Sequence, residues 1–237
     1  MPRTARASVG DMCYHVLNRG NARAAVFRKD GDYDAFLDLI AGACDRIPMR
    51  VLGYCLMPNH FHLVVRPHED GDLSRWMQWL LTSHVRRHHR HHRTEGGGHV
   101  WQGRFKAFPI ERDEHLLAVV RYVERNPRRA NLVRAAENWR WSSLRHRIAK
   151  AGDKGRASDA AASPPPWLSP LPIDLPRHWA QRVNQAETDA ELAALRRSVQ
   201  RGTPFGSDRW TLRTVAKLGL ESTIRPRGRP RKGGGIK

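Results

Sequence analysis

The chain has 237 residues, of which 42 are Lys or Arg and 23 are Asp or Glu, so its formal net charge is +19. A surplus this large favours a polyanionic partner, and nucleic acid is favoured over acidic lipid because no basic amphipathic helix or anchor is evident. The mean hydropathy is −0.65 and no segment approaches the roughly 18 apolar residues of a membrane span, which excludes an integral membrane protein. There is no apolar run of signal-peptide length, and three cysteines without Cys-x-x-Cys spacing exclude a disulfide framework, so we expect a reducing cytoplasm.

The first 150 residues alternate between strand-like and helix-like segments. Runs of β-branched and aromatic residues predict strands at residues 12–17, 50–56, 61–66 and 105–111. Apolar residues at helical spacing predict helices at 30–47, at 73–93 and from an N-cap at Asp113 to Asn126, where Pro127 is expected to end the helix. The order βαββαβα predicts the α+β class: a ferredoxin-like antiparallel sheet with helices on one face.

The composition changes after residue 150, which predicts four regions. We expect a catalytic domain over 1–150 and a linker rich in Pro, Ala and Ser over 151–176. A small helical region follows over 177–224, with short helices at 189–200 and 208–218. The last stretch, 225–237, is almost entirely cation, Pro and Gly, and it is expected to be disordered because it cannot form a core.

Two histidines near the start of a predicted strand are separated by one residue. Side chains at positions i and i+2 of a strand point to the same face, so His60 and His62 are expected to project together. Two imidazoles placed in this way form half of a divalent-metal site, and a third ligand must come from another element. On the evidence of this pair alone, His60 and His62 are more often ordinary polar residues than metal ligands.

The third predicted helix carries a tyrosine and an amide on one side. Tyr122 and Asn126 are four residues apart and therefore lie one above the other, just off the apolar stripe. An amide oxygen can complete a three-ligand site suited to Mg²⁺ or Mn²⁺, and a phenol beside such a metal can attack a phosphate. By helix position alone, an amphipathic core tyrosine is the simpler reading of Tyr122.

Basic residues gather in three places that are candidates for DNA contact. The segment 82–93 contains four Arg and five His without an acid, which suits phosphate tracking, and metal capture by its histidines is expected to be adventitious. Aromatic and basic residues interleave over 101–108, which favours base stacking, although a core role is as common for such aromatics. The Arg-Gly-Arg-Pro tail favours a tether or a minor-groove contact. The candidate DNA-binding residues are Arg19, Arg86, Arg87, Trp101, Arg104, Lys106, Arg225, Arg227 and Arg229.

Five segments in the same order closely resemble the REP-associated tyrosine transposases, bacterial relatives of the single-tyrosine, His-hydrophobic-His (HUH) insertion-sequence transposases. These segments are Tyr14-His15-Val16 with Asn18-Arg19-Gly20-Asn21, residues 54–62, 98–106 and 122–133, and Trp139-Arg140-Trp141-Ser142-Ser143. The resemblance covers roughly residues 14–147. One departure is Arg128, where the family commonly has Val after Asn-Pro; we expect position 128 to lie past the helix end and to affect packing or DNA contact.

The resemblance implies an activity and assigns roles to four residues. His60 and His62 match the metal-binding pair, Tyr122 matches the tyrosine that forms a 5′-phosphotyrosine bond with single-stranded DNA, and Asn126 matches the third-ligand position. The implied protein is an endonuclease and strand transferase of DNA transposition. It uses Mg²⁺ or Mn²⁺ to nick and rejoin single-stranded DNA at palindromic hairpin repeats.

The implied enzyme works in the cytoplasm on the nucleoid, as a monomer or homodimer, with no membrane and no small-molecule substrate. Two alternatives remain open at this point. One is a non-catalytic DNA- or RNA-binding regulator on a transposase scaffold. The other is a metal-dependent hydrolase that uses water and forms no covalent adduct.

Overall fold

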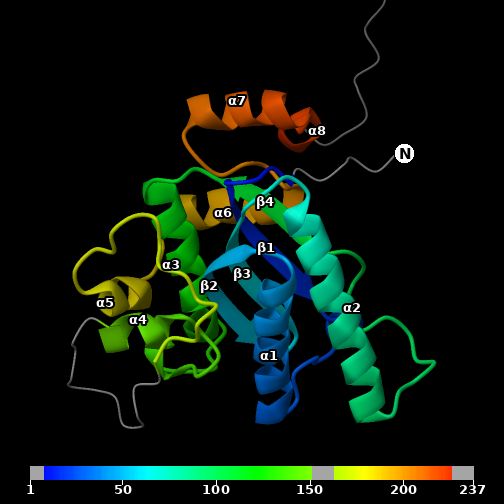
Figure 1. The fold of residues 1–237 in the computed structure, drawn as a ribbon. Coiled ribbons are helices and arrows are strands. Elements are labelled where there is room, and N and C mark those ends of the chain that lie inside the picture. Colours follow the sequence, from blue (N-terminus) through cyan, green and yellow to red (C-terminus); the bar gives the residue numbers. More distant parts are fainter. Residues whose placement is uncertain (1–7, 151–162, 226–237) are drawn as a thin grey trace, which may run out of the picture.

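The structure, a computed structural model, describes residues 8–150 and 163–225 (Figure 1). Its centre is a sheet of four strands, β1 (Cys13–Arg19), β2 (Met49–Met57), β3 (His60–Pro67) and β4 (Lys106–Ile110). The strand order is β2-β3-β1-β4, and every neighbouring pair is antiparallel. This order places the first and third strands in the middle, as in a ferredoxin-like fold, and confirms the predicted α+β class.

Two helices cover one face of the sheet. α1 (Asp30–Arg46) and α2 (Asp72–His92) lie side by side in front of it in Figure 1. Strand side chains such as Tyr14 and Leu63 pack on this face against Phe36 and Trp76, and all four are fully buried. The 3-10 turn η1 (Asn21–Arg23) leads from β1 toward α1. The expectation of helices on one face therefore holds for α1 and α2.

The opposite face is covered by α3 (Glu114–Arg129). The sequence predicted this helix but placed all helices on one face. Phe108 and Ile110 of β4 pack there with Leu116 and Val123 of α3. Alternation along each strand thus supplies two cores, one on each side of the sheet.

Pro127 lies inside α3, so the expectation that it ends the helix is wrong. A proline removes one backbone donor, which here leaves the carbonyl of Val123 without its usual partner. The side-chain amide of Asn126 donates to that carbonyl at 3.4 Å and to the carbonyl of Tyr122 at 3.1 Å. The helix therefore continues to Arg129, almost one turn past Asn126, and Arg128 is within it rather than past its end.

The C-terminal region adds short elements. They are the 3-10 turn η2 (Ala136–Asn138), α4 (Leu144–Lys150), α5 (Trp179–Asn184), α6 (Asp189–Arg201), α7 (Asp208–Leu218) and α8 (Glu221–Ile224). Of these, η2 and α5 pack on α3, and α6 packs against β4. Trp179 and Leu195 are buried in the same core as Val123. None of the helices in 8–150 or 163–225 is long and apolar enough to cross a membrane.

The expected linker over 151–176 falls into two parts. Residues 151–162 lie outside the described residues, as do 226–237 of the expected tail. The remaining part is not free, because Leu168 forms a β-bridge with Val51 and Trp167 packs against the buried core. This half of the segment therefore belongs to the folded body.

Arginines on the outer side of α3 fasten it to α5. Arg121 donates to the backbone carbonyls of Arg182, Gln185 and Ala186, and Arg125 donates to that of Gln185. Arg128 donates to the carbonyl of Asn184. Carbonyls at a helix C-terminus carry partial negative charge, so they suit guanidinium donors. The departure at position 128 consequently serves packing between α3 and α5.

Candidate active site

His60 and His62 project from the start of β3 toward α3. In the register of the sheet, His60 lies opposite Arg19 of β1, and His62 lies opposite Leu17. His62 is 3% exposed and His60 is half-buried, and their ring centroids are 5.0 Å apart. The two imidazoles thus share one face at the edge of the core beneath α3.

Hydrogen bonds orient both rings through their Nδ1 atoms. Nδ1 of His60 lies 2.7 Å from Oδ1 of Asn59, and the Asn59 amide is held in turn by donating to the carbonyl of Arg23 at 3.0 Å. Because Oδ1 only accepts, the proton of His60 lies on Nδ1 and the lone pair on Nε2. Nδ1 of His62 lies 2.9 Å from Nε2 of His15. A histidine that binds a metal through Nε2 typically donates from Nδ1 to a neighbouring acceptor, as His60 does to Asn59.

Burial keeps these imidazoles neutral. Desolvation, helped by the nearby Arg19 and Arg129, lowers the pKa of His60 to about 4. The same cause lowers the pKa of fully buried His15 to about 3 and that of His62 well below its usual value. A neutral imidazole is the form that binds a metal ion, so near pH 7 protons do not compete for these nitrogens.

Tyr122 approaches the histidines from α3. Its ring is 7% exposed and meets the ring of His62 edge-on, with centroids 5.9 Å apart, and that of His15 at 6.2 Å. The guanidinium of Arg129 lies over the ring of the phenol, 4.1 Å from its centroid, and donates to Oδ1 of Asn126. Four groups of interest therefore surround Tyr122: two imidazoles, a guanidinium and an amide.

Arg129 and His15 belong to this site, although the sequence reasoning did not select them. Arg129 is three residues after Asn126 and seven after Tyr122, a spacing that places all three on one helix face. His15 is within the Tyr-His-Val segment. It lies opposite Val64 on β3, and His62 is two residues from Val64 on the same face of that strand. Helical spacing was thus a usable signal for Arg129, whereas His15 could be found only from strand register.

The C-terminal region also reaches the site. Glu187, between α5 and α6, lies 3.3 Å from the guanidinium of Arg129 and 3.3 Å from that of Arg125. Its side chain is only 4% exposed, so this carboxylate sits in the interface rather than in solvent. Glu187 therefore fixes the position of Arg129 from a segment about 60 residues further along the chain.

The histidine pair and Asn126 carry donor atoms of the kinds that a divalent cation takes. Nε2 of His60 and of His62 are the ring nitrogens left for a ligand once Nδ1 is engaged. Oδ1 of Asn126 is a suitable third donor, but it accepts a hydrogen bond from Arg129, so the guanidinium must release it first. Two further groups of possible metal ligands occur in the described part of the chain: Asp32 with His91 and His92, and Glu111 with Asp113 and His115.

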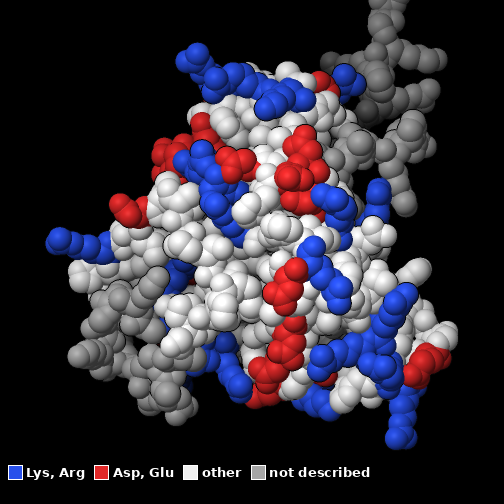
Figure 2. Space-filling model, in the orientation of Figure 1, with Lys and Arg blue, Asp and Glu red and all other residues white. Residues whose placement is uncertain are grey.

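The candidate DNA-contact residues divide between two places. Arg86, Trp101 and Arg104 line a groove of about 980 Å³ between α2 and residues 97–105. Trp101 is only 4% exposed and packs against Phe61 at 5.2 Å, so its ring is part of the core and offers little area for stacking. Figure 2 shows basic side chains over the lower end of α2 and acidic ones along α1, so this face is not uniformly basic.

The other candidates are spread more widely. Arg87 is exposed on α2 outside that groove, while Arg19 and Lys106 are exposed on β1 and β4, on the same sheet face as the histidine pair. Arg225 ends the described part of the chain, and its carbonyl accepts from Arg201. Arg227 and Arg229 lie outside the described residues.

A ferredoxin-like sheet that presents a histidine pair to a tyrosine on a covering helix is the arrangement expected of a single-tyrosine transposase. Residues 8–126 match the family described as "Transposase IS200 like", so the chain belongs to that family of transposases. The matched part ends at Asn126 and thus includes the histidine pair and Tyr122 but not Arg129.

Two known proteins are similar to the chain. A REP-associated tyrosine transposase of Haemophilus influenzae is 28% identical over 118 residues, which cover 46% of this chain and 65% of that protein. The chain thus spans slightly less than two thirds of the length of this curated relative. A solved structure of a REP-associated tyrosine transposase bound to a REP hairpin has a TM-score of 0.55 at 18% identity, covering 64% of this chain and 87% of the other, which shows a shared fold. The resemblance to this group is confirmed.

Proposed function

We propose that the chain is a DNA transposase that nicks and rejoins single-stranded DNA at palindromic hairpin repeats, with Tyr122 as nucleophile. The observation that carries the proposal is the position of Tyr122, edge-on to His62 and covered by the guanidinium of Arg129. The similarity to the REP-associated group, one member of which has been solved with a REP hairpin, supports hairpin DNA as substrate. We expect the protein to act in the cytoplasm on the nucleoid, as a monomer or homodimer.

The proposed reaction is a transesterification. The Tyr122 oxygen attacks the scissile phosphorus and forms a bond to the 5′-phosphate while the bond to the 3′-oxygen breaks. The phenol gives up its proton to solvent and the leaving 3′-oxygen takes one up, so a free 3′-OH is released and the protons balance. A 3′-OH can later attack the phosphotyrosine and reverse these steps. The energy of the phosphodiester is kept in the phosphotyrosine, so rejoining needs no nucleotide cofactor.

Four residues would surround the phosphate. His60 and His62, with Asn126 once Arg129 has released it, would hold a divalent cation, Mg²⁺ or Mn²⁺. When bound, the cation supplies positive charge that neutralises the phosphate in the transition state. Arg129 is already beside Tyr122, and its planar fork suits two phosphate oxygens. Binding of the phosphate by Arg129 would free the Asn126 oxygen in the same event.

The nucleophile is tested with a labelled hairpin oligonucleotide and Mg²⁺ or Mn²⁺. The parent should give a covalent protein–DNA adduct on a denaturing gel, and Tyr122→Phe should give none. Tyr33→Phe is a matched control, because Tyr33 is similarly buried, at 6% exposed, on the other side of the sheet. An adduct in Tyr122→Phe would show that another residue is the nucleophile.

The second candidate is a DNA- or RNA-binding regulator without catalysis. The hydrogen bond from Arg129 to Asn126 favours it, since it occupies the third metal donor. Tight binding without cleavage over a range of hairpins and both metals would support this role. Cleavage without any covalent adduct would instead support a hydrolase that uses water.

A further inference from the structure

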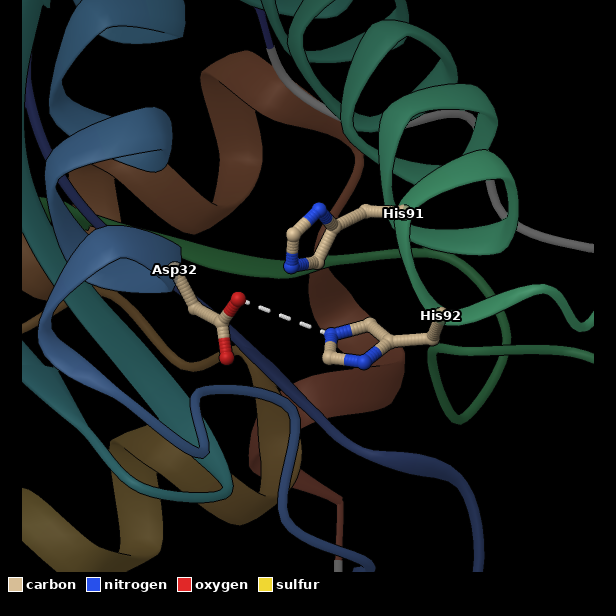
Figure 3. Close-up of side chains that lie close together, drawn as sticks. All are labelled: Asp32, His91 and His92. Carbon is tan, nitrogen blue, oxygen red and sulfur yellow. Dashed lines mark ion pairs between the residues drawn. The ribbon is translucent and has the colours of Figure 1, made fainter.

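A second group of metal-type side chains lies between the start of α1 and the end of α2, on the opposite face of the sheet from Tyr122. Asp32 comes from α1, and His91 and His92 come from α2; Figure 3 shows the three side chains pointing toward one another. One ligand atom from each lies within 4.8 Å of the other two. The group therefore bridges two helices that the packing already brings together.

A third histidine of α2 belongs to the same place. His88, His91 and His92 are at positions i, i+3 and i+4, which share one face of a helix. All three line a cavity of about 170 Å³ together with Asp32. The ring of His92 lies 4.5 Å from that of His88 and 4.9 Å from that of His91, measured between centroids.

Several nitrogens in this cavity have no hydrogen bond. Nδ1 and Nε2 of His88 are both buried, and neither has a hydrogen-bond partner within the described part of the chain. Nδ1 of His84, one turn earlier and 5% exposed, is in the same condition. Buried polar atoms are nearly always paired, and a bound ion is one of the few things that satisfies a lone pair at such a position. The orphan nitrogens thus point to a ligand in the cavity.

The carboxylate of Asp32 is held by backbone hydrogen bonds to one oxygen, and its other oxygen faces His92 at ion-pair distance (Figure 3). Its Oδ2 accepts from the backbone N–H groups of Arg28 at 2.8 Å and Lys29 at 3.2 Å, which holds the carboxylate at the helix start. Its Oδ1 lies 3.5 Å from Nε2 of His92, longer than an ordinary hydrogen bond. Two ligands on a tetrahedral zinc ion are about 3.4 Å apart, so this pair already has the spacing that one shared ion requires.

The other group of possible ligands differs in this respect. Oδ1 of Asp113 accepts from the backbone N–H of His115 at 2.9 Å and lies 2.8 Å from its ring Nδ1, which caps the start of α3. Oε2 of Glu111 accepts from the backbone N–H of Ser207. Those atoms already have partners, so that group needs no ion.

We propose that Asp32, His88, His91 and His92 bind a divalent ion of the zinc class, which fastens the end of α2 to the start of α1. Three imidazoles and one carboxylate are donors that Zn²⁺ prefers, whereas Mg²⁺ prefers oxygen ligands alone. The neighbouring cations Lys29 and Arg87 are exposed, so solvent screens their repulsion. The ion would hold in place the part of α2 that carries Arg86 and Arg90. This site is independent of the reaction proposed for Tyr122.

Calorimetric titration of the full chain with Zn²⁺ tests the proposal. The titration is made in a His60→Ala, His62→Ala background, so that binding at the first histidine pair does not contribute. One ion per chain should bind, and His88→Gln with His92→Gln should weaken its affinity by about 100-fold or more. His89→Gln is the matched control, because His89 is on the same helix but pairs with Thr94 and lies outside this cavity. It should bind zinc like its parent.

Thermal unfolding gives a second readout that does not depend on activity. Zn²⁺ binds the folded chain preferentially, so it should raise the unfolding temperature of the parent and of His89→Gln but not of the His88, His92 variant. Equal unfolding temperatures of all three without metal would show that the substitutions leave the fold intact. The proposal would be overturned if the parent did not bind zinc. It would also be overturned if the parent and the His88, His92 variant bound zinc with equal affinity. Stabilisation by inorganic phosphate instead of zinc would overturn it as well.

Discussion

At the scale of single residues, Arg129 contacts both Tyr122 and Asn126, so it connects the proposed nucleophile with the proposed third metal ligand. Its guanidinium stacks on the phenol at 4.1 Å and hydrogen-bonds the amide oxygen. The carboxylate of Glu187 forms an ion pair with the same guanidinium at 3.3 Å and fixes its position. A guanidinium held beside the phenol in this way is positioned to bind the phosphate that Tyr122 is proposed to attack, and positive charge fixed at such a place stabilises a transition state.

Replacing Arg129 should therefore slow cleavage more than it weakens DNA binding. We expect Arg129→Ala to reduce the single-turnover cleavage rate by roughly 100-fold, the usual loss for one transition-state donor. Arg129→Lys should recover only part of the rate, because an ammonium lacks the planar fork. Arg134→Ala, an exposed arginine just beyond α3, serves as the control. Equal rates for Arg129→Ala and Arg134→Ala would remove Arg129 from the site.

His15 predicts how stability depends on pH. Burial lowers its pKa to about 3 in the folded protein, against about 6.5 in the unfolded chain. Between these values the unfolded chain binds the extra proton, so the free energy of unfolding falls as the pH is lowered from about 6.5 toward 3. His15→Gln should reduce this slope by about 1.4 kcal/mol per pH unit, measured by urea unfolding with a chelator present. An unchanged slope would show that His15 is not held neutral.

At the scale of elements, α5 gives α3 its outer support. Trp179 of α5 is 7% exposed, and its indole N–H donates to Oε2 of Glu124 at 2.7 Å. Glu124 is fully buried on α3 and is also bonded by Arg147 and Ser143. The helix that carries Tyr122 is thus positioned by segments from the C-terminal region as well as by the sheet.

Trp179→Ala should destabilise the whole fold. Loss of a buried tryptophan and of a partner of Glu124 should lower the free energy of unfolding by about 3–5 kcal/mol, as measured by urea denaturation. Trp179→Phe keeps most of the packing and should lose less. If Trp179→Ala behaved like a surface substitution, α5 would not be packed on α3.

The sequence predicted most elements to within a few residues because periodicity and caps are local signals. Asp113 caps α3 as expected, and the helices expected at 189–200 and 208–218 are α6 and α7. Pro127 was misread because the compensating donor is the side chain of Asn126, which no local pattern reveals. Of the candidate site, strand and helix spacing singled out the histidine pair and Tyr122 only as candidates, and the resemblance to the REP-associated tyrosine transposases assigned their roles. Glu187 could not be found in this way, because its contact with Arg129 spans 58 positions.

At the scale of the whole molecule, the folded body and the basic tail have different expected roles. α6 contributes Leu195 to the buried core, and the hydroxyl of Thr203 donates to the carbonyl of Thr223 in α8 at 2.9 Å, while residues 226–237 lie outside the described residues. We propose that residues 225–232 engage duplex DNA beside the cleaved strand and raise affinity through a high effective concentration. The charge of the tail supports this role.

Removal of residues 225–237 tests the tail and leaves α8 in place. Binding of hairpin DNA should weaken, and the slope of its affinity against salt should become shallower, because phosphate contacts are lost. Cleavage at saturating DNA should not change, since Tyr122 and both histidines remain. Faster cleavage at saturating DNA would instead identify the tail as an inhibitory lid.

The attachment point of the DNA tests the central claim, the role of Tyr122, most directly. After reaction with a labelled hairpin and Mn²⁺, the covalent adduct is digested with nuclease and trypsin and mapped by mass spectrometry. Because Arg121 and Arg125 flank the nucleophile, trypsin releases it as the tetrapeptide Tyr122-Val123-Glu124-Arg125. We expect the residual nucleotide on this tetrapeptide through a 5′-phosphate linkage. A nucleotide on any other peptide, or cleaved DNA with no modified peptide, would contradict catalysis by Tyr122.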